Sequence, residues 1–328
     1  ILGTGKIAKR FMQAAFYVPE AQVVAVGSRE QHTADQFGAQ YGVPKRYGSY
    51  DPLISDPEVE IVYVATPHTL HAENTLAALQ AGKHVLCEKP FTVNAQQAEV
   101  VIQAARASGK FIMEGMWTRC FPVVREIVRR IQAGELGEIR YLQADFGFRP
   151  AFDPVSRLFA PELGGGALLD VGCYAVNFCR LFAGAEPCRV RAHAHRAGVD
   201  LTLAAQLDFP GDIAGHILCS FEAEGSYSAE IIGTAGKLLL PNPWLPPGGR
   251  GEIILTRGTV ADTIPVVTAH WLTPFAAEIE HLNDCIRTGR PPQFPPGVDA
   301  ETDSRANARV LDALRTAAQI SETIVSKM

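Results

Sequence analysis

Residues 1–8 read ILGTGKIA, which matches the pattern Gly-x-Gly-x-x-Ala and leads directly into an amphipathic segment, residues 7–16. The first glycine, Gly3, permits a tight turn, and the second, Gly5, lets a pyrophosphate approach the main chain. The small side chain of Ala8 lets the following helix pack closely on the strand, and the free N–H groups at the helix N-terminus suit phosphate. The stretch therefore predicts a strand–turn–helix unit that binds a dinucleotide.

Strand-like and helix-like segments alternate through the first part of the chain. We expect strands at residues 23–26, 61–65, 85–87 and 111–113, and helices at 7–16, 31–41, 72–81 and 95–107. Glycine follows several of these helices, as it commonly does at helix C-termini (Gly42, Gly82 and Gly109). The alternation is typical of a doubly wound parallel sheet, a Rossmann-type α/β domain that we place at residues 1–121.

The pattern changes after Phe121, and strands then predominate. We expect helices at residues 123–133, 169–182, 274–288 and 300–325, and strands at 139–148, 189–195, 202–209, 214–221, 228–232, 237–240 and 253–256. Short turns such as Pro210-Gly211-Asp212 favour antiparallel hairpins, and residues 241–249 read as a surface loop. We therefore expect a second domain at residues 122–328, of α+β class with a largely antiparallel open sheet.

Length and composition indicate a soluble globular protein with two domains. The chain has 328 residues, of which 47% are hydrophobic and 20% are charged. Its net charge of −5 favours neither nucleic acid nor an anionic membrane as a partner. We find no apolar run of the roughly 18–20 residues that span a bilayer. Because Ile1 stands immediately before the glycine turn, we expect most of the first strand to precede it.

The seven cysteines are scattered, and none forms a Cys-x-x-Cys pair. Several have apolar neighbours, which favours buried free thiols in a reducing cytoplasm. His193 and His195 alternate along a strand-like segment, so we expect both side chains on the same face of a strand. Because no cysteine or carboxylate cluster lies near them in the sequence, we expect no metal site.

The residue that contacts the cofactor ribose is expected about 20 residues after the glycine turn, at the end of the strand at 23–26. There the chain has Gly27-Ser28-Arg29 and no Asp or Glu. A carboxylate would accept hydrogen bonds from the NAD ribose and repel a 2′-phosphate, whereas arginine binds phosphate in a bidentate way. This predicts a preference for NADP, with NAD as a possible second cofactor. The alternative is an ordinary surface arginine at the start of a helix.

Residues 84–90 read HVLCEKP, a short buried strand that ends in a charged pair and a proline. Proline disfavours the helical conformation in the preceding residue, so we expect Lys89 in an extended corner at the strand's carboxyl end. In open parallel sheets, ligands bind at that edge. Lys89 would therefore present its ammonium group to a ligand. The alternative is a solvated lysine at a strand end.

Residues 164–174 read GGGALLDVGCY, a glycine-rich turn followed by the start of a helix. Asp170 and Tyr174 are four residues apart and would share one face of that helix. With a nearby lysine they form a proton-transfer set, because an adjacent ammonium stabilises a phenolate, which can take the proton of an alcohol while hydride leaves its carbon. The alternative is that Asp170 caps the helix and Tyr174 packs in the core.

Together these motifs resemble the glucose–fructose oxidoreductase/inositol dehydrogenase (Gfo/Idh/MocA) family over essentially the whole chain. The resemblance also rests on ATPH at residues 65–68, with His71, and on CEKP at residues 87–90. Tyr174, where many relatives have histidine, and MEGMWTR at residues 113–119 are closer to the dimeric dihydrodiol dehydrogenase and NADP-linked D-xylose dehydrogenase branch.

The resemblance assigns roles to individual residues. Lys89, Asp170 and Tyr174 occupy the family's catalytic positions. The cofactor-binding positions are occupied by Gly3, Gly5, Lys6, Ile7, Ala8, Ser28, Arg29, Thr66, Pro67, His71, Glu88 and Lys89. The positions expected to line the substrate pocket are Trp117, Phe148, Arg157, Asp170, Tyr174 and Trp244.

The resemblance also implies a function and an assembly. It implies a cytoplasmic NADP-dependent dehydrogenase for a secondary hydroxyl or lactol of a cyclic polyol, a sugar such as D-xylose, or a trans-dihydrodiol. It further implies a homodimer or higher homo-oligomer joined through the sheet of the second domain. Two alternatives remain: a regulatory protein that senses a sugar and binds cofactor without turnover, and a glycosidase that uses its cofactor for transient oxidation.

Overall fold

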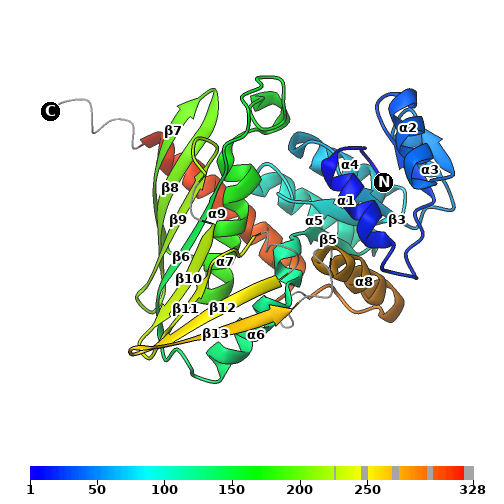
Figure 1. Ribbon diagram of the computed structural model, residues 1–328. Coiled ribbons are helices and arrows are strands. Elements are labelled where there is room, and N and C mark those ends of the chain that lie inside the picture. The colour runs from blue at the N-terminus through cyan, green and yellow to red at the C-terminus, as the bar shows by residue number, and fades with distance from the viewer. Residues whose placement is uncertain (225–226, 245–249, 268–272, 294–297, 321–328) are drawn as a thin grey trace. The chain divides into compact units, whose positions relative to one another are not determined.

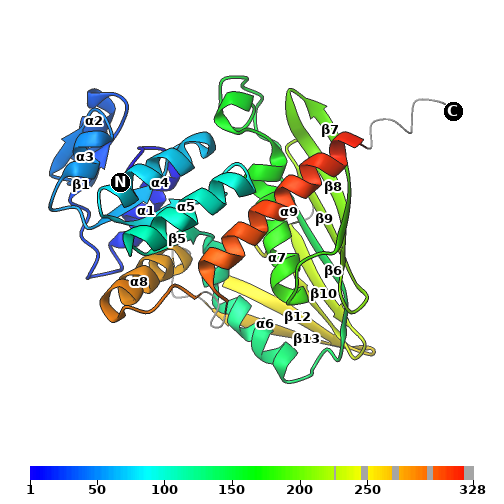
Figure 2. The same ribbon diagram turned by 180° about the vertical axis from the view of Figure 1, so that it is seen from behind.

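The computed structural model describes residues 1–224, 227–244, 250–267, 273–293 and 298–320 (Figures 1 and 2). The chain forms two compact units. The first comprises Ile1–Cys120 and Leu272–Arg305, and the second comprises Phe121–Trp271 and Ala306–Met328. Residues 245–249 of the expected loop and 321–325 of the expected last helix lie outside the described residues.

The first unit contains a parallel sheet. Its strands are β1 (Ala25–Gly27), β2 (Lys45–Tyr47), β3 (Ile61–Val64), β4 (His84–Glu88) and β5 (Ile112–Gly115). Leu2 forms parallel bridges to both Gly27 and Val64, and so joins the pair β1–β2 to the trio β3–β4–β5. The resulting order, β2-β1-Leu2-β3-β4-β5, confirms the expected doubly wound sheet.

The helices of the first unit end largely where glycine predicts. Those in the segment Ile1–Cys120 are α1 (Lys6–Ala15), α2 (Gln31–Tyr41), α3 (Asp51–Ser55), α4 (His71–Gln80) and α5 (Ala95–Ser108). Gly42 and Gly109 follow α2 and α5 with φ of 72° and 64°, in the left-handed region that glycine tolerates best. β2 and α3 were not expected from the sequence, because each is too short to show a periodic apolar pattern.

The expected boundary at residue 121 is wrong for one later segment, which contains α8 (Thr273–Thr288). Phe275 on α8 stacks on Trp117 with ring centroids 5.3 Å apart. Leu282 is fully buried in a cluster that also contains Met12 and Val26. Since the apolar face of α8 is buried in the core of the first unit, this segment belongs to that unit and not to a continuous second domain.

The second unit is built on one large sheet. Its strands are β6 (Ile139–Gly147), β7 (Arg189–Ala197), β8 (Val199–Phe209), β9 (Ile213–Ser220), β10 (Ser228–Gly233), β11 (Lys237–Leu240), β12 (Arg250–Arg257) and β13 (Val260–Val267), in the order β13-β12-β11-β10-β6-β9-β8-β7. Every pairing is antiparallel except β6–β9, which confirms the expected largely antiparallel sheet. The sequence analysis missed β13, whose segment contains an aspartate and a proline.

Helices of the second unit cover one face of its sheet. These are α6 (Pro122–Gln132) and α7 (Cys173–Ala183), and the latter packs on β6 and β9 (Figures 1 and 2). The helix α9 (Ala300–Ile320) begins in the first unit and continues in the second. Asn307 on α9 donates to the Cys173 carbonyl at 3.3 Å and accepts from Arg180 at 3.3 Å, so α9 is bound to α7.

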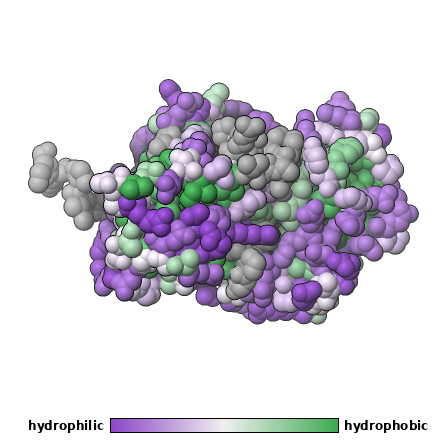
Figure 3. Space-filling model, turned by 60° about the horizontal axis from the view of Figure 1, so that its bottom comes forward, coloured by the Kyte–Doolittle hydropathy of each residue, from purple (hydrophilic) through white to green (hydrophobic). Residues whose placement is uncertain are grey.

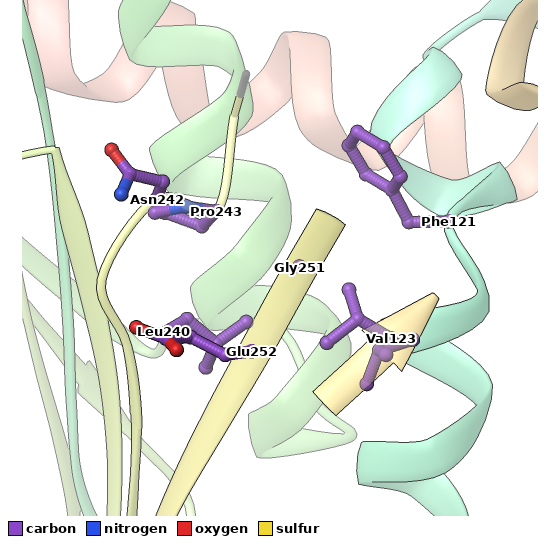
Figure 4. Close-up of a pocket in the computed structure, with 8 residues that line it drawn as sticks. Phe121, Val123, Leu240, Asn242, Pro243, Gly251 and Glu252 are labelled. Carbon is purple, nitrogen blue, oxygen red and sulfur yellow. The ribbon is translucent and has the colours of Figure 1, made fainter. Parts of the chain in front are cut away.

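A small, mostly apolar cavity lies in the second unit beside the start of α6. Phe121 lies immediately before α6, Val123 lies in its first turn, and Gly251 lies on β12 (Figure 4). Leu240 lines it from the end of β11, and Asn242 and Pro243 line it from the segment that follows. It contains none of the residues that the sequence analysis assigns to the site.

Among the described residues, one segment, Pro161–Ala183, is long and apolar enough to cross a membrane by length and composition alone. However, 89% of its most apolar window is buried inside the structure, as in the core helix of a soluble protein. On the face shown in Figure 3, hydrophobic areas are interspersed with hydrophilic residues.

The cysteines are free thiols, all buried except Cys188. Within the described ranges no group of three metal-ligating side chains occurs.

Candidate active site

The glycine turn precedes α1 and leaves space in front of it. Gly3 has φ of 99°, and a Cβ there would lie 2.6 Å from the Ala65 carbonyl oxygen, so only glycine is tolerated. Gly5 is the N-cap residue of α1, and because it has no side chain, it does not cap the N–H groups of the first turn. A Cβ on Gly5 would have no heavy atom within 4 Å. The N-terminal N–H groups of α1 therefore suit a pyrophosphate, and the turn fits the expected dinucleotide.

Ser28 and Arg29 follow β1 directly, at the carboxyl end of that strand. The Ser28 N–H donates to the Tyr47 carbonyl at 3.0 Å, which ties this corner to β2, and Arg29 is exposed. The ring of Tyr50 covers Gly27, because a Cβ there would lie 3.3 Å from the Tyr50 Cδ1. Burial raises the pKa of Tyr50, and the Arg29 guanidinium opposes that shift. Tyr50 was not among the residues predicted for the site, because no sequence motif marks it.

The loop after β3 is fixed through Thr66 and His71. The Asn74 side chain donates to Thr66 Oγ1 at 3.1 Å. His71 is buried, and its Nε2 lies 3.0 Å from the Thr66 carbonyl while its Nδ1 lies 2.8 Å from the Pro90 carbonyl. The imidazole therefore joins the loop that carries Thr66 and Pro67 to the loop that follows β4.

The carboxyl end of β4 carries Glu88 and Lys89, as the sequence predicts for a strand that ends before Pro90. Glu88 is buried and accepts a 2.5 Å hydrogen bond from the Tyr63 hydroxyl. Its Oε2 accepts from the Lys89 N–H at 3.2 Å. Lys89 itself is half-buried. Lys89 thus lies at the same edge of the sheet as Gly3, Ser28 and Thr66, where ligands of parallel sheets bind.

In the second unit, Asp200 holds the glycine-rich turn. Gly164 and Gly166 have φ of 75° and 116°. A Cβ on Gly166 would collide with Asp200 Oδ1, and Asp200 Oδ2 accepts from the Leu168 N–H at 2.6 Å. Burial raises the pKa of Asp200. Asp200 lies 32 residues from Leu168 along the chain, and nothing in the sequence indicates this contact.

The helix after this turn differs from the expected α-helix in its first part. Leu168–Gly172 forms a π-helix, and α7 begins only at Cys173. Because a π-helix has more residues per turn, the i,i+4 rule that placed Asp170 and Tyr174 on one face is not exact here. Such irregular turns occur frequently at functional sites.

Asp170 and Tyr174 are both buried in the second unit. Arg157, which is half-exposed, donates to Asp170 Oδ1 at 2.9 Å. The Tyr174 ring lies 5.6 Å from that of Phe146 and 6.1 Å from that of Trp244. The structure therefore gathers four of the expected residues, Arg157, Asp170, Tyr174 and Trp244, around the start of α7.

Two further expected residues lie in aromatic groups. Phe148 follows β6, and its ring lies 5.2 Å from that of Phe221. Trp117 is buried in the turn after β5, against Phe275. Trp244 is anchored by its indole N–H, which donates to the Asp145 carbonyl at 2.7 Å. These contacts give the aromatic residues defined positions within their own units.

Two family models match the chain. Residues 1–116 match the model described as an oxidoreductase family with an NAD-binding Rossmann fold, and residues 124–239 match the GFO/IDH/MocA C-terminal domain. The chain belongs to the Gfo/Idh/MocA oxidoreductase family. The resemblance noted in the sequence is therefore confirmed, and this member is an oxidoreductase with a nucleotide-binding first domain.

Curated relatives of this family member include dihydrodiol dehydrogenases. It is 38% identical over 310 residues to trans-1,2-dihydrobenzene-1,2-diol dehydrogenase from Bos taurus, with 88% of each chain covered. It is 36% identical to the enzyme of that name from Macaca fascicularis, again over 88% of each chain.

Solved structures show the same fold. Aldose–aldose oxidoreductase from Caulobacter crescentus superposes with a TM-score of 0.88 and 28% identity, over 98% of this chain and 96% of the other. A 3-ketoreductase from Actinomadura kijaniata, in complex with NADP and TDP-benzene, gives a TM-score of 0.86 and 30% identity over 96% of each chain. Structures of that ketoreductase also exist with one lysine or one tyrosine substituted.

Proposed function

We propose that this oxidoreductase is an NADP-dependent dehydrogenase for a secondary hydroxyl or lactol of a cyclic polyol, a sugar or a trans-dihydrodiol. The observation that carries the proposal is the arrangement at the carboxyl edge of the first sheet. There an open glycine turn precedes α1, and Lys89 follows β4 with its N–H bonded to the Glu88 side chain. Relatives named for dihydrodiols, aldoses and a 3-keto group support this substrate class.

The proposed cofactor preference rests on Ser28 and Arg29. Neither residue is acidic, so nothing at this corner of β1 repels a 2′-phosphate. Arg29 is exposed and can bind that phosphate in a bidentate way, while Tyr50 presents an aromatic ring beside it. The solved ketoreductase relative contains NADP, which supports the same preference here.

In the proposed mechanism, the glycine turn before α1 would hold NADP, which would supply the hydride acceptor for the carbon that bears the hydroxyl. We assign proton abstraction to Tyr174, and to Lys89 the cation that favours the phenolate, because the family resemblance gives both residues catalytic positions. Asp170 forms an ion pair with Arg157 within its own unit. We therefore propose that Asp170 orients polar groups and does not itself transfer the proton. His71 and Glu88 act by holding the loops that follow β3 and β4. Trp117, Phe148 and Trp244 provide apolar surface for a ring-shaped substrate.

The test is a panel of aldopentoses, aldohexoses, inositols and a trans-dihydrodiol, each incubated with NADP while NADPH absorbance is followed. Net NADPH formation with at least one of them supports the dehydrogenase. Hydrolysis of a glycoside without net NADPH would instead indicate cofactor-assisted glycosidase chemistry. Binding of a sugar without either reaction would indicate a sensor.

We also propose that the protein is a cytoplasmic homodimer or larger homo-oligomer, joined through the uncovered face of the second sheet. That face carries Tyr141, Gln143, Ala204, Gln206, His216 and Leu218. It mixes polar and apolar side chains, and protein–protein interfaces are on the whole about as apolar as the rest of a protein surface. Free thiols support the cytoplasmic location.

A further inference from the structure

The three residues after β4 have their main chain held by three buried side chains. Glu88 Oε2 accepts from the Lys89 N–H at 3.2 Å. His71 Nδ1 lies 2.8 Å from the Pro90 carbonyl. Glu114 Oε1 accepts from the Phe91 N–H at 2.9 Å. The segment 89–91 is therefore fixed along its whole length, although it is not part of a regular strand or helix.

Glu114, on β5, has contacts on both of its carboxylate oxygens. Its Oε1 accepts from Phe91, and its Oε2 accepts from the Ser304 hydroxyl at 2.7 Å. The guanidinium of Arg119 lies 3.7 Å from the same Oε2, and Arg119 is also paired with Asp303. Burial raises the pKa of Glu114, and the charge of Arg119 opposes this. The carboxylate is thus oriented by side chains from two elements.

Glu114 is itself 5% exposed, so it can affect a ligand only through the groups that it touches. The nearest such group with a proposed chemical role is Lys89, two residues before Phe91. We propose that Glu114 is a positioning residue, which fixes the main chain of residues 89–91 and thereby the direction in which Lys89 presents its ammonium. This inference rests on the proposed role of Lys89 in turnover.

Replacement by alanine would leave the Phe91 N–H buried without its acceptor and let the segment shift. A shift of about 1 Å in a catalytic group can lower turnover by about 100-fold. For Glu114→Ala we expect kcat to fall by about 10- to 100-fold, with the NADP dissociation constant changed less than about threefold. Glu114→Gln keeps an oxygen for Phe91 and should retain most of the parent's kcat.

A double-mutant cycle with Lys89 tests the inference, because a merely structural role would not depend on Lys89. Single-turnover rates are measured for the parent, Glu114→Ala, Lys89→Met and the double variant. If Glu114 acts through Lys89, Glu114→Ala slows the parent but does not slow Lys89→Met further. Equal slowing in both backgrounds would overturn the inference. If Glu114→Ala does not fold, the same cycle is measured with Glu114→Gln. The smaller loss of rate caused by Glu114→Gln should then occur in the parent background and be absent in the Lys89→Met background.

Asp56 provides a matched control, since it is also a buried carboxylate of the first unit that accepts a main-chain N–H, that of Glu58 at 3.0 Å. Asp56→Ala should lower the melting temperature without lowering kcat. Two outcomes separate this inference from the proposed function. A Lys89→Met variant with the parent's turnover would refute the role of Lys89 itself. A slow Lys89→Met variant beside a Glu114→Ala variant with the parent's kcat would refute only the positioning role.

Discussion

At the scale of single residues, Arg29 is the side chain on which the choice of dinucleotide depends most. It is exposed at the end of β1, so its contribution can be measured without disturbing the core. For Arg29→Ala, we expect NADP binding to weaken by about 1.5–3 kcal/mol, which is roughly ten- to a hundredfold, because a charge-assisted contact to the 2′-phosphate is lost. NAD binding should remain within about twofold, since NAD has no 2′-phosphate.

Isothermal titration with both dinucleotides measures this effect. Arg106→Ala is the control, because Arg106 is another exposed arginine of the first unit, paired with Glu301 on its surface. The assignment is refuted if the parent protein binds NAD and NADP equally well.

Tyr174 is the second residue whose chemistry can be tested in isolation. The variant Tyr174→Phe removes only the hydroxyl and keeps the ring that contacts Phe146 and Trp244. Folding and NADP binding should therefore survive, while turnover should fall by about 10²–10⁴-fold, the usual value of general acid–base catalysis. The measurement is the pH dependence of kcat and kcat/KM, with Lys89→Met beside it.

Removal of the Lys89 ammonium should move the basic limb of the pH profile to higher pH, because an adjacent cation favours the phenolate. Should Tyr174→Phe retain the parent's turnover and pH profile, the base would have to be another group, with Lys89 as the first candidate.

At the scale of elements, the glycine-rich turn before α7 depends on one buried carboxylate. Asp200 accepts the Leu168 N–H, and Gly166 makes room for it. Asp200→Ala leaves that N–H without its acceptor and should lower the free energy of unfolding by about 1–3 kcal/mol. Asp200→Asn keeps an oxygen acceptor and should lower the free energy of unfolding clearly less than Asp200→Ala does. Urea unfolding compares the two variants, and equal losses would show that the hydrogen bond is not the cause.

The helix α8 carries a buried carboxyl group, Glu278, whose Oε1 has no hydrogen-bond partner within the described part of the structure. Burial raises its pKa well above the usual value, and the nearby Glu88 acts in the same direction. Between the unfolded pKa of about 4.3 and the raised folded pKa, the folded state holds a proton that the unfolded state has lost. The free energy of unfolding therefore falls as pH rises through this range.

Glu278→Gln removes this titration and keeps the shape of the side chain. As pH rises from about 5 to 8, the free energy of unfolding of the variant should increase relative to that of the parent. The difference should grow by up to about 1.4 kcal/mol per pH unit. Urea unfolding at several pH values measures the difference. Glu280→Gln is the control, since Glu280 is exposed on the same helix. Parallel curves for Glu278→Gln and the parent would contradict the raised pKa.

At the scale of the whole molecule, no helix among the described residues of the second unit covers one face of its sheet (Figures 1 and 2). We expect at least a dimer at micromolar concentration, and Ala204→Arg should weaken it, because Ala204 is a small exposed residue beside Leu218 on that face. Val260→Arg, at the exposed start of β13, is the control. Sedimentation velocity measures the assembly, and a single species of 35.5 kDa in the parent would contradict it.

The local features of this fold were predictable from the sequence because their causes are local. Gly3 has a left-handed conformation and a close main-chain neighbour that exclude any larger residue, and Gly42 ends α2 at the expected residue. The alternation of strands and helices, the antiparallel character of the second sheet and the strand-end place of Lys89 follow from periodicity and from proline. These features identified the fold class, the family and the candidate residues.

Features that depend on residues far apart in the sequence were decided only by the tertiary structure. The apolar face of α8 has the same pattern whichever core buries it, so its place in the first unit was not predictable. The Ser304–Glu114 bond joins residues 190 positions apart, and the contact of Tyr50 with Gly27 has no motif. Leu168, the first residue of the π-helix Leu168–Gly172, likewise donates its N–H to Asp200, 32 residues further along the chain. A sequence pattern records which side of a segment is apolar, but the partner that covers that side is chosen by packing of the whole chain.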